Sequence, residues 1–210
     1  MNRGLLAIAL AAVLAALAVS IYVDVHPVIA QDITVERDVQ MVSWGPLAYT
    51  FPVFSWIGDA KGLGLEVIVF VLVLIVNRRS WIFAATAALT GGWYVLISHL
   101  ILRPRPTTAQ VIQVTEHPGA SSYPSGHTMF VLTVMVVLML CLGYRFLPRW
   151  AYPVGWAIVV AVVIANGIAR IDTGAHWPTD VVGGLLISTA WLLLLLSITW
   201  VSSRLRTESE

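Results

Sequence analysis

Three short polar clusters interrupt an apolar chain, and each contains residue types that could bind or transfer a phosphoryl group. The first cluster is the Arg-Pro-Arg-Pro segment that contains Arg103 and Arg105. Arginine suits phosphate because its planar guanidinium can donate two parallel hydrogen bonds. Arginines at the edge of a membrane helix also extend toward lipid headgroups, so this cluster alone leaves both interpretations open.

The second cluster, residues 121–127, ends in Ser125, Gly126 and His127 immediately before a long apolar run. Serine and glycine at the start of a helix expose backbone N–H groups, and the helix dipole favours an anion in front of them. His127 would lie in the first turn, where an imidazole can hand a proton to a leaving oxygen near neutral pH. By itself, the pattern also fits a helix cap with an incidental histidine.

The third cluster contains Arg170, His176 and Asp180. Pro178 suits the first turn of a helix, and Asp180 follows His176 by four residues, close enough for the carboxylate to hold one imidazole nitrogen. A histidine oriented in this way is an activated base or nucleophile. A surface His-Asp pair that caps a helix is the alternative for this cluster in isolation.

The composition indicates a membrane as the surrounding solvent. Of the 210 residues, 59% are hydrophobic and 11% are charged, and the formal net charge is +1. A soluble domain usually has about a quarter charged residues. The near-zero net charge gives no indication of a nucleic-acid partner. The one cysteine, Cys141, can form neither an internal disulfide nor a thiolate metal site, and we interpret it as a packing residue.

The apolar runs predict an all-α fold, a six-helix transmembrane bundle with short loops. A helix needs about 20 largely apolar residues to cross a bilayer. The expected spans are approximately residues 4–23, 62–76, 81–102, 126–146, 151–169 and 181–201, in a single domain covering residues 1–210. The first span also resembles a secretory signal peptide, whose removal would leave five helices.

Basic residues predict the orientation, because short cytoplasmic loops retain Lys and Arg. With a cytoplasmic N-terminus, seven arginines lie inside: Arg3, Arg78, Arg79, Arg145, Arg149, Arg204 and Arg206. The C-terminus is then also cytoplasmic, and all three polar clusters meet at the outer ends of the third to sixth helices. The segment 24–61 has no expected span, and its aromatic residues fit either a loop over the bundle or a lipid access path.

With their order and spacing, the three clusters resemble the signatures of the type 2 phosphatidic acid phosphatases, a family related to vanadium haloperoxidases and bacterial acid phosphatases. Those signatures are Lys-x6-Arg-Pro, Pro-Ser-Gly-His and Ser-Arg-x5-His-x3-Asp. The second is intact at residues 124–127. The third is present from Arg170 to Asp180, with Ala169 in place of serine. The first keeps Arg105 and Pro106.

The resemblance implies a role for each matching residue. His176 would attack phosphorus and form a phosphohistidine, Asp180 would support its ring, and His127 would protonate the leaving group. The groups that hold the phosphoryl oxygens would be Arg105, Arg170, Ser125 and Gly126. This chemistry requires no metal and no cofactor.

The main departure from the family pattern is Ser98, which stands where the first signature has lysine. Loss of that ammonium could weaken phosphate binding by one charge-assisted hydrogen bond, about 1.5–3 kcal/mol. Arg103 and His99 are candidates to compensate, because both lie within two turns of Ser98.

The expected activity is metal-independent hydrolysis of a phosphomonoester or pyrophosphate on a lipid of the cell membrane. By resemblance, the candidate substrates are undecaprenyl pyrophosphate, phosphatidic acid and phosphatidylglycerol phosphate. Two alternatives stay open: a lipid phosphotransferase that uses the same histidine, and a non-catalytic lipid-binding membrane protein with a decayed site. The expected partners are the lipid substrate and the bilayer, and the sequence leaves the oligomeric state open.

Overall fold

The computed structural model describes residues 1–58, 60–116 and 119–205, and all regular structure within them is helical. In this described part, five helical stretches are long and apolar enough to cross a membrane: Arg3–Val25, Arg78–Leu100, Gly126–Phe146, Arg149–Asp172 and Pro178–Ser197. A shorter apolar stretch covers Gly64–Val76. The chain therefore has the multi-pass helical character that its sequence predicts.

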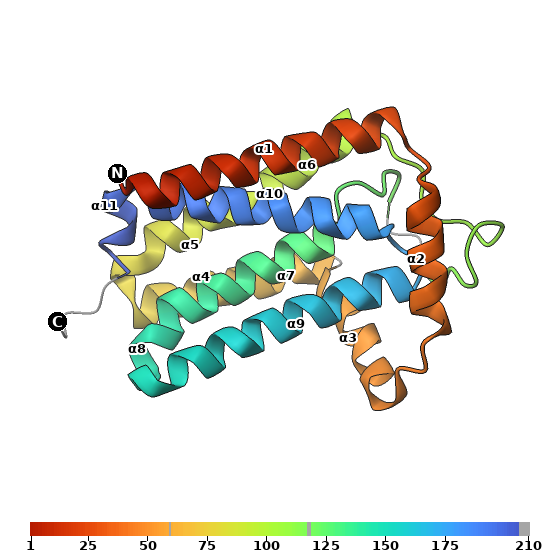
Figure 1. The fold of residues 1–210 in the computed structure, drawn as a ribbon. Helices are drawn as coiled ribbons and strands as arrows, with labels where there is room; N and C mark the ends of the chain where they lie inside the picture. The colour runs from red at the N-terminus through yellow and green to blue at the C-terminus, as the bar shows by residue number, and fades with distance from the viewer. Residues whose placement is uncertain (59, 117–118, 206–210) are drawn as a thin grey trace.

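The long helices run side by side, and one short helix crosses an end of the bundle (Figure 1). In chain order the elements are α1 (Arg3–Val25), α2 (Ala30–Met41), η1 (Gly45–Thr50), α3 (Phe51–Gly58), α4 (Ala60–Val76), η2 (Arg78–Ser80), α5 (Trp81–Ala88), α6 (Thr90–Leu100), α7 (Gly126–Val137), η3 (Leu138–Gly143), α8 (Tyr144–Phe146), η4 (Arg149–Ala151), α9 (Tyr152–Asp172), α10 (Pro178–Ser197) and α11 (Thr199–Ser202). The helix that crosses the end is α2, whereas the N-terminus and α11 lie at the opposite end.

Helix α7 lies inside the bundle and packs against α6, α9 and α10, while α1 packs along α10. Two glycines let α10 approach the turn before α7 closely. A Cβ atom on Gly183 would lie 2.3 Å from the Tyr123 ring, and one on Gly184 would lie 2.8 Å from the Ser125 carbonyl oxygen. Small residues are typical of such contacts in membranes, where helices associate through close packing.

The expected helix over residues 81–102 is interrupted. Helix α5 ends at Ala88, and α6 begins at Thr90 and ends at Leu100. The Thr86 and Thr90 hydroxyls donate to carbonyl oxygens of the preceding turn, at 2.7 Å in each case, and Gly91 follows directly. Such side-chain bonds and glycines are recognised causes of helix bends.

The segment 24–61, for which no span was expected, is largely helical, with α2, η1 and α3 in turn. The last long helix also begins earlier than expected, at Pro178, which occupies its first turn. These shifts bring α2 against the beginning of α10. Of the basic residues used to predict the orientation, Arg206 lies outside the described residues.

Candidate active site

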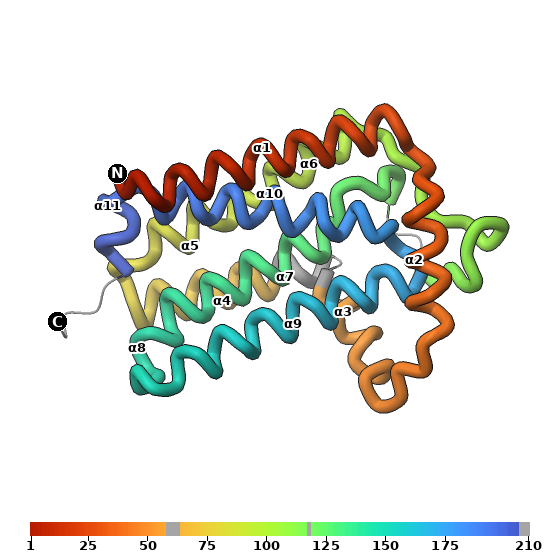
Figure 2. The backbone as a smooth tube through the Cα atoms, viewed as in Figure 1, coloured from red at the N-terminus to blue at the C-terminus, as the bar shows by residue number. Residues whose placement is uncertain are grey.

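The three polar clusters lie toward the end of the bundle that α2 crosses. His127 is in the first turn of α7, Arg170 is in the last turn of α9, and Asp180 is in the first turn of α10. Between α6 and α7, residues 101–116 and 119–125 lie at this end, as the backbone trace in Figure 2 shows. Arg105 from this segment donates to the Ala175 carbonyl oxygen, next to His176 in the chain. The rings of His127 and His176 have centroids 6.2 Å apart. The fold thus brings together residues from four separate segments.

His176 is buried, and the structure fixes which of its ring nitrogens carries the proton. Its Nδ1 lies 2.7 Å from the Ser122 carbonyl oxygen. Because a carbonyl can only accept, Nδ1 must be the donor and Nε2 keeps its lone pair in the neutral ring. Burial lowers the pKa of His176; the neighbouring Asp180 opposes this shift, and Arg105 adds to it. The imidazole is therefore neutral near pH 7 and can act as a nucleophile through Nε2.

Asp180 lies near this ring without a hydrogen bond to it. Its Oδ2 lies 3.8 Å from His176 Nδ1, which is longer than a hydrogen bond, and the Nδ1 proton goes to Ser122 instead. The same Oδ2 accepts the backbone N–H of Trp177 at 2.9 Å and so caps α10. The spacing predicted a direct hydrogen bond between the Asp180 carboxylate and the His176 imidazole. In the structure the two groups interact only through their charges, at 3.8 Å.

Arg170 is fully buried, and its guanidinium contacts two residues that the sequence did not suggest. Nη1 donates to Oε2 of Glu116 at 2.7 Å, and Nη2 donates to Oγ of Ser55 at 2.5 Å. Ser55 and Glu116 are also hydrogen-bonded to each other. The Nε atom of Arg170 is buried and has no hydrogen-bond partner among the described residues. A carboxylate and a hydroxyl thus engage the two Nη atoms of Arg170.

Arg105 is held by backbone carbonyls of two segments. Its Nε donates to Gly119 at 2.9 Å, Nη1 to Ala175 at 2.5 Å and Nη2 to Ser121 at 2.5 Å. These contacts tie the segment before α7 to the turn before α10. Burial lowers the pKa of Arg105, but an arginine stays charged at physiological pH. Arg105 therefore brings a fixed positive charge close to His176.

Ser125 and Gly126 form the N-terminus of α7. Ser125 is the N-cap, and its Oγ accepts from the backbone N–H and the hydroxyl of Thr128 at 3.4 and 3.0 Å. A Cβ atom at Gly126 would lie 2.9 Å from the ring of Tyr94, so only glycine fits here without movement of that ring. Gly126 thus permits the close packing of α7 on α6.

The two residues considered as substitutes for the missing lysine lie in different surroundings. His99 is exposed on α6, and its Nδ1 bonds to the Val95 carbonyl oxygen at 2.7 Å. Arg103 is buried, and protein acceptors engage all three of its guanidinium nitrogens. Ser98 donates to the same carbonyl of Val95 at 3.1 Å. The structure brings His99 to the surface of α6 and directs Arg103 toward α2 and α10.

Sequence reasoning missed four residues at this end of the molecule: Asp32, Glu36, Ser55 and Glu116. Asp32 and Glu36 lie one turn apart on α2, and both are buried. Both oxygens of Glu36 lack a hydrogen-bond partner among the described residues. Two acids at a spacing of four residues between apolar spans were the available signal, but the same spacing is typical of a solvated helix face.

Comparison with known proteins agrees with this arrangement. The profile of the PAP2 superfamily matches residues 67–204. Undecaprenyl-diphosphatase BcrC of Bacillus subtilis is 29% identical over 121 residues, which cover 51% of this chain and 58% of that protein. The undecaprenyl-diphosphatase of Sulfolobus acidocaldarius is 34% identical over 94 residues, which cover 45% of this chain and 41% of that protein. The matched part therefore spans about half the length of these relatives.

A solved structure shares the fold over nearly the whole chain. The transmembrane PAP2-type phosphatidylglycerolphosphate phosphatase of Bacillus subtilis superposes with a TM-score of 0.72 at 19% identity, covering 96% of this chain and 98% of that one. The residues of all three signatures lie within the matched range 67–204. The chain therefore belongs to the PAP2 superfamily, the family of the type 2 phosphatidic acid phosphatases.

Proposed function

We propose that this protein hydrolyses a phosphomonoester or diphosphate on a membrane lipid, through a phosphohistidine at His176 and without a metal ion. The observation that carries the proposal is the hydrogen bond from His176 Nδ1 to the Ser122 carbonyl oxygen, at 2.7 Å. It leaves the Nε2 lone pair for attack on phosphorus. The ring of His127, with its centroid 6.2 Å away, can serve the leaving group.

The reaction would take place in two balanced steps. First, His176 Nε2 forms a bond to phosphorus while the bond to the leaving oxygen breaks, and that oxygen takes a proton from His127. Then a water molecule attacks the phosphohistidine, gives its proton to His127 and releases inorganic phosphate, and the electron pair of the P–N bond returns to Nε2. The enzyme regains its starting protonation state.

Two arginines would supply the positive field that a metal provides in other phosphatases. Arg105 acts on His176 and Arg170 acts on His127 through their positive charges. The Ser125 hydroxyl and the Gly126 N–H at the N-terminus of α7 would add further donors, because the Ser125 N–H already donates to the Asp180 carbonyl oxygen at 3.1 Å. Arg170 is engaged by Glu116 at 2.7 Å. A phosphate that binds Arg170 must share it with this carboxylate or displace it.

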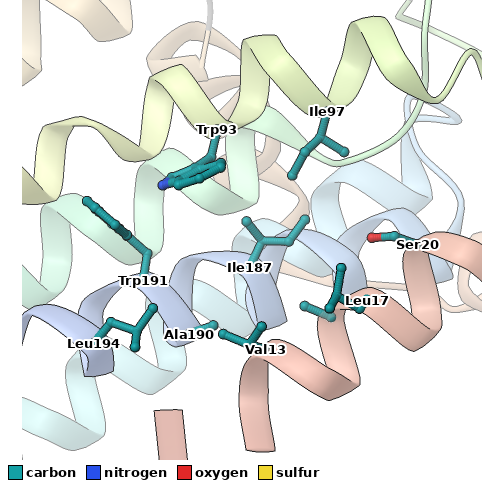
Figure 3. A pocket seen from close by; sticks show the side chains of 10 residues that line it. Val13, Leu17, Ser20, Trp93, Ile97, Ile187, Ala190, Trp191 and Leu194 are labelled. Atoms are coloured by element: carbon teal, nitrogen blue, oxygen red, sulfur yellow. The ribbon is translucent and has the colours of Figure 1, made fainter. Parts of the chain in front are cut away.

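An apolar groove between α1, α6 and α10 supports a lipid substrate (Figure 3). The groove has a volume of about 250 Å³, and its lining includes Trp93 and Ile97 from α6 opposite Ile187 and Trp191 from α10. Ser20 of α1 also lines it, and the Ser20 hydroxyl lies 2.8 Å from the Tyr123 hydroxyl. Since Tyr123 directly precedes the Pro-Ser-Gly-His turn, a hydrocarbon chain in the groove would lead toward the site.

The names of the relatives point to the substrate class. Two of them are called undecaprenyl-diphosphatases, and the structural neighbour is called a phosphatidylglycerolphosphate phosphatase. Undecaprenyl pyrophosphate, phosphatidic acid and phosphatidylglycerol phosphate are therefore the lipids to test.

The decisive experiment measures phosphate release from these three lipids by the detergent-purified protein, with and without EDTA. We expect release that resists EDTA and is lost in His176→Gln. His26→Gln is the matched control, because it makes the same change at an exposed histidine outside the three polar clusters. A wild type that releases no phosphate from any of the three lipids would refute the proposal. Activity abolished by EDTA and restored by a divalent ion would refute its metal-free mechanism.

A second assay separates hydrolysis from transfer. If an added alcohol acceptor consumes lipid phosphate without equivalent release of inorganic phosphate, the protein is a phosphotransferase.

We further propose that the site faces outward, with both termini in the cytoplasm. Thr108→Cys and Ser203→Cys place thiols at opposite ends, and the only native cysteine, Cys141, is buried. An impermeant maleimide should label only the first variant in intact cells.

A further inference from the structure

A buried ion network connects α2 to the first turn of α10. Oδ2 of Asp32 lies 2.6 Å from Nη2 of Arg103, and both side chains are almost completely buried. Asp32 also accepts the Thr179 N–H at 3.0 Å and the Thr179 hydroxyl at 2.6 Å. One carboxylate of α2 therefore binds both Arg103 and the N-terminus of α10.

Arg103 also connects this network to Asp180. Its Nη1 donates to Oδ1 of Asp180 at 2.5 Å and to the Thr179 hydroxyl at 2.7 Å. Its Nε donates to the Pro27 carbonyl oxygen at 2.9 Å, which fixes the plane of the guanidinium. An arginine whose two Nη atoms each bind a different carboxylate has a defined geometry that a lysine cannot reproduce.

Both oxygens of Asp180 are thereby held. Arg103 binds Oδ1, and the Trp177 backbone N–H binds Oδ2, which lies 3.8 Å from Nδ1 of His176. We infer that Asp32 and Arg103 are positioning residues, which fix the Asp180 carboxylate beside His176 and set how much of its negative charge the imidazole senses. This inference rests on the proposed role of His176 as the nucleophile.

The charges predict the direction of the effect. Arg103 is shared between two carboxylates, so its positive charge compensates only part of the charge on Asp180. In Asp32→Asn, Arg103 would neutralise Asp180 alone, and the negative potential at His176 would fall. The imidazole would become less basic and a weaker nucleophile, and the cationic phosphohistidine would lose stabilisation. Substrate binding would change little, because Asp32 and Arg103 contact other protein groups.

The other charged or titratable groups that act on His176 keep their identity in every variant. They are Arg105 in the segment before α7, His127 on α7 and Asp180 on α10. Arg170 on α9 acts on His127, and Glu36 on α2, whose pKa burial raises to about 9, stays protonated near neutral pH. A difference between wild type and Asp32→Asn therefore reports on Asp32 and the arginine that it holds.

The test compares the kcat, KM and pH profile of wild type, Asp32→Asn, Asp32→Glu and Asp38→Asn on the best lipid phosphate. For Asp32→Asn we expect kcat to fall on the order of tenfold, as for other residues that orient a reactive group, with KM within twofold. The acid limb of the profile should move to lower pH. Asp32→Glu should return the limb toward its wild-type position, and Asp38→Asn, an exposed acid on the same helix, should change nothing.

A second measurement, the pKa of His176 by NMR, does not depend on catalysis, so it tests the inference even in a variant with little activity. In protein labelled with 15N-histidine, NMR titration gives the imidazole pKa of His176, assigned through His176→Gln among the five histidines. We expect a lower pKa in Asp32→Asn than in wild type. An unchanged pKa, or a loss of thermal stability without movement of the acid limb, would overturn the inference. Inactive wild-type protein would instead refute the proposed function.

Discussion

Replacing Glu36 with glutamine should stabilise the protein above pH 5. Glu36 is completely buried on α2, and neither of its carboxylate oxygens has a hydrogen-bond partner among the described residues. Burial raises the pKa of this carboxyl from 4.5 to about 9, and the negative charges of Asp180 and Asp32 contribute to the rise while Arg103 opposes it. The folded protein therefore keeps the Glu36 proton at neutral pH, whereas the unfolded chain loses it.

The sign and size of the effect follow from this difference. Between the unfolded pKa of 4.5 and the folded pKa of about 9, the native state binds more protons, so raising the pH favours unfolding. Each pH unit costs about 1.4 kcal/mol, and pH 7.5 lies about three units above the unfolded pKa, which gives on the order of 4 kcal/mol. Glutamine does not ionise in either state and avoids this cost. For a chain of this size the gain corresponds to on the order of 10 °C in Tm.

The assay is thermal unfolding in detergent, followed by tryptophan fluorescence from pH 4.5 to 9. The Tm difference between Glu36→Gln and wild type should be near zero at pH 4.5, should grow steadily with pH and should level off near pH 9. Asp38→Asn serves as the control, because Asp38 is exposed on the same helix. A Tm difference that stays constant between pH 5 and pH 8 would show that Glu36 ionises normally in the folded protein, and the reasoning would fail.

Three further changes test the phosphate site and the groove. Ser98→Lys restores the ammonium of the family signature, and we expect a higher kcat/KM on lipid phosphates; lost activity with unchanged Tm would mean that the site is rebuilt around Ser98. Glu116→Gln removes the carboxylate that lies 2.7 Å from Arg170, so inorganic phosphate should inhibit more strongly, by several-fold, and weaker inhibition would contradict the competition between carboxylate and phosphate. Ala190→Phe places a ring in the apolar groove and should raise KM several-fold for a long-chain lipid phosphate but not for a short-chain analogue, whereas an equal rise for both would argue against a hydrocarbon chain in the groove.

The membrane-spanning character could be predicted from the sequence because it depends on local composition. Runs of about 20 apolar residues must form helices in a bilayer, where every backbone polar group needs an internal partner. The interruption at Leu89 was missed because it coincides with the Thr86 and Thr90 bonds, and such hydroxyls can either face outward or bond to the preceding turn. Helix α2 was missed for a different reason: its acidic and apolar residues are mixed, so the sequence shows no long apolar face.

The three polar clusters, and with them the family, were determined by the sequence alone, because their residue types and spacing survive in the linear order. The partners of those residues were decided by tertiary structure. Asp32 and Arg103 are 71 positions apart, and Asp32 and Thr179 are 147 positions apart, so no periodicity in the chain reports that they meet. Arg103 and Arg105 look equivalent in the sequence, yet the fold gives one a pair of buried carboxylates and the other a set of backbone carbonyls. Burial excludes water from these groups, and each charge must then take whichever partner the packing of α2, α9 and α10 brings within reach.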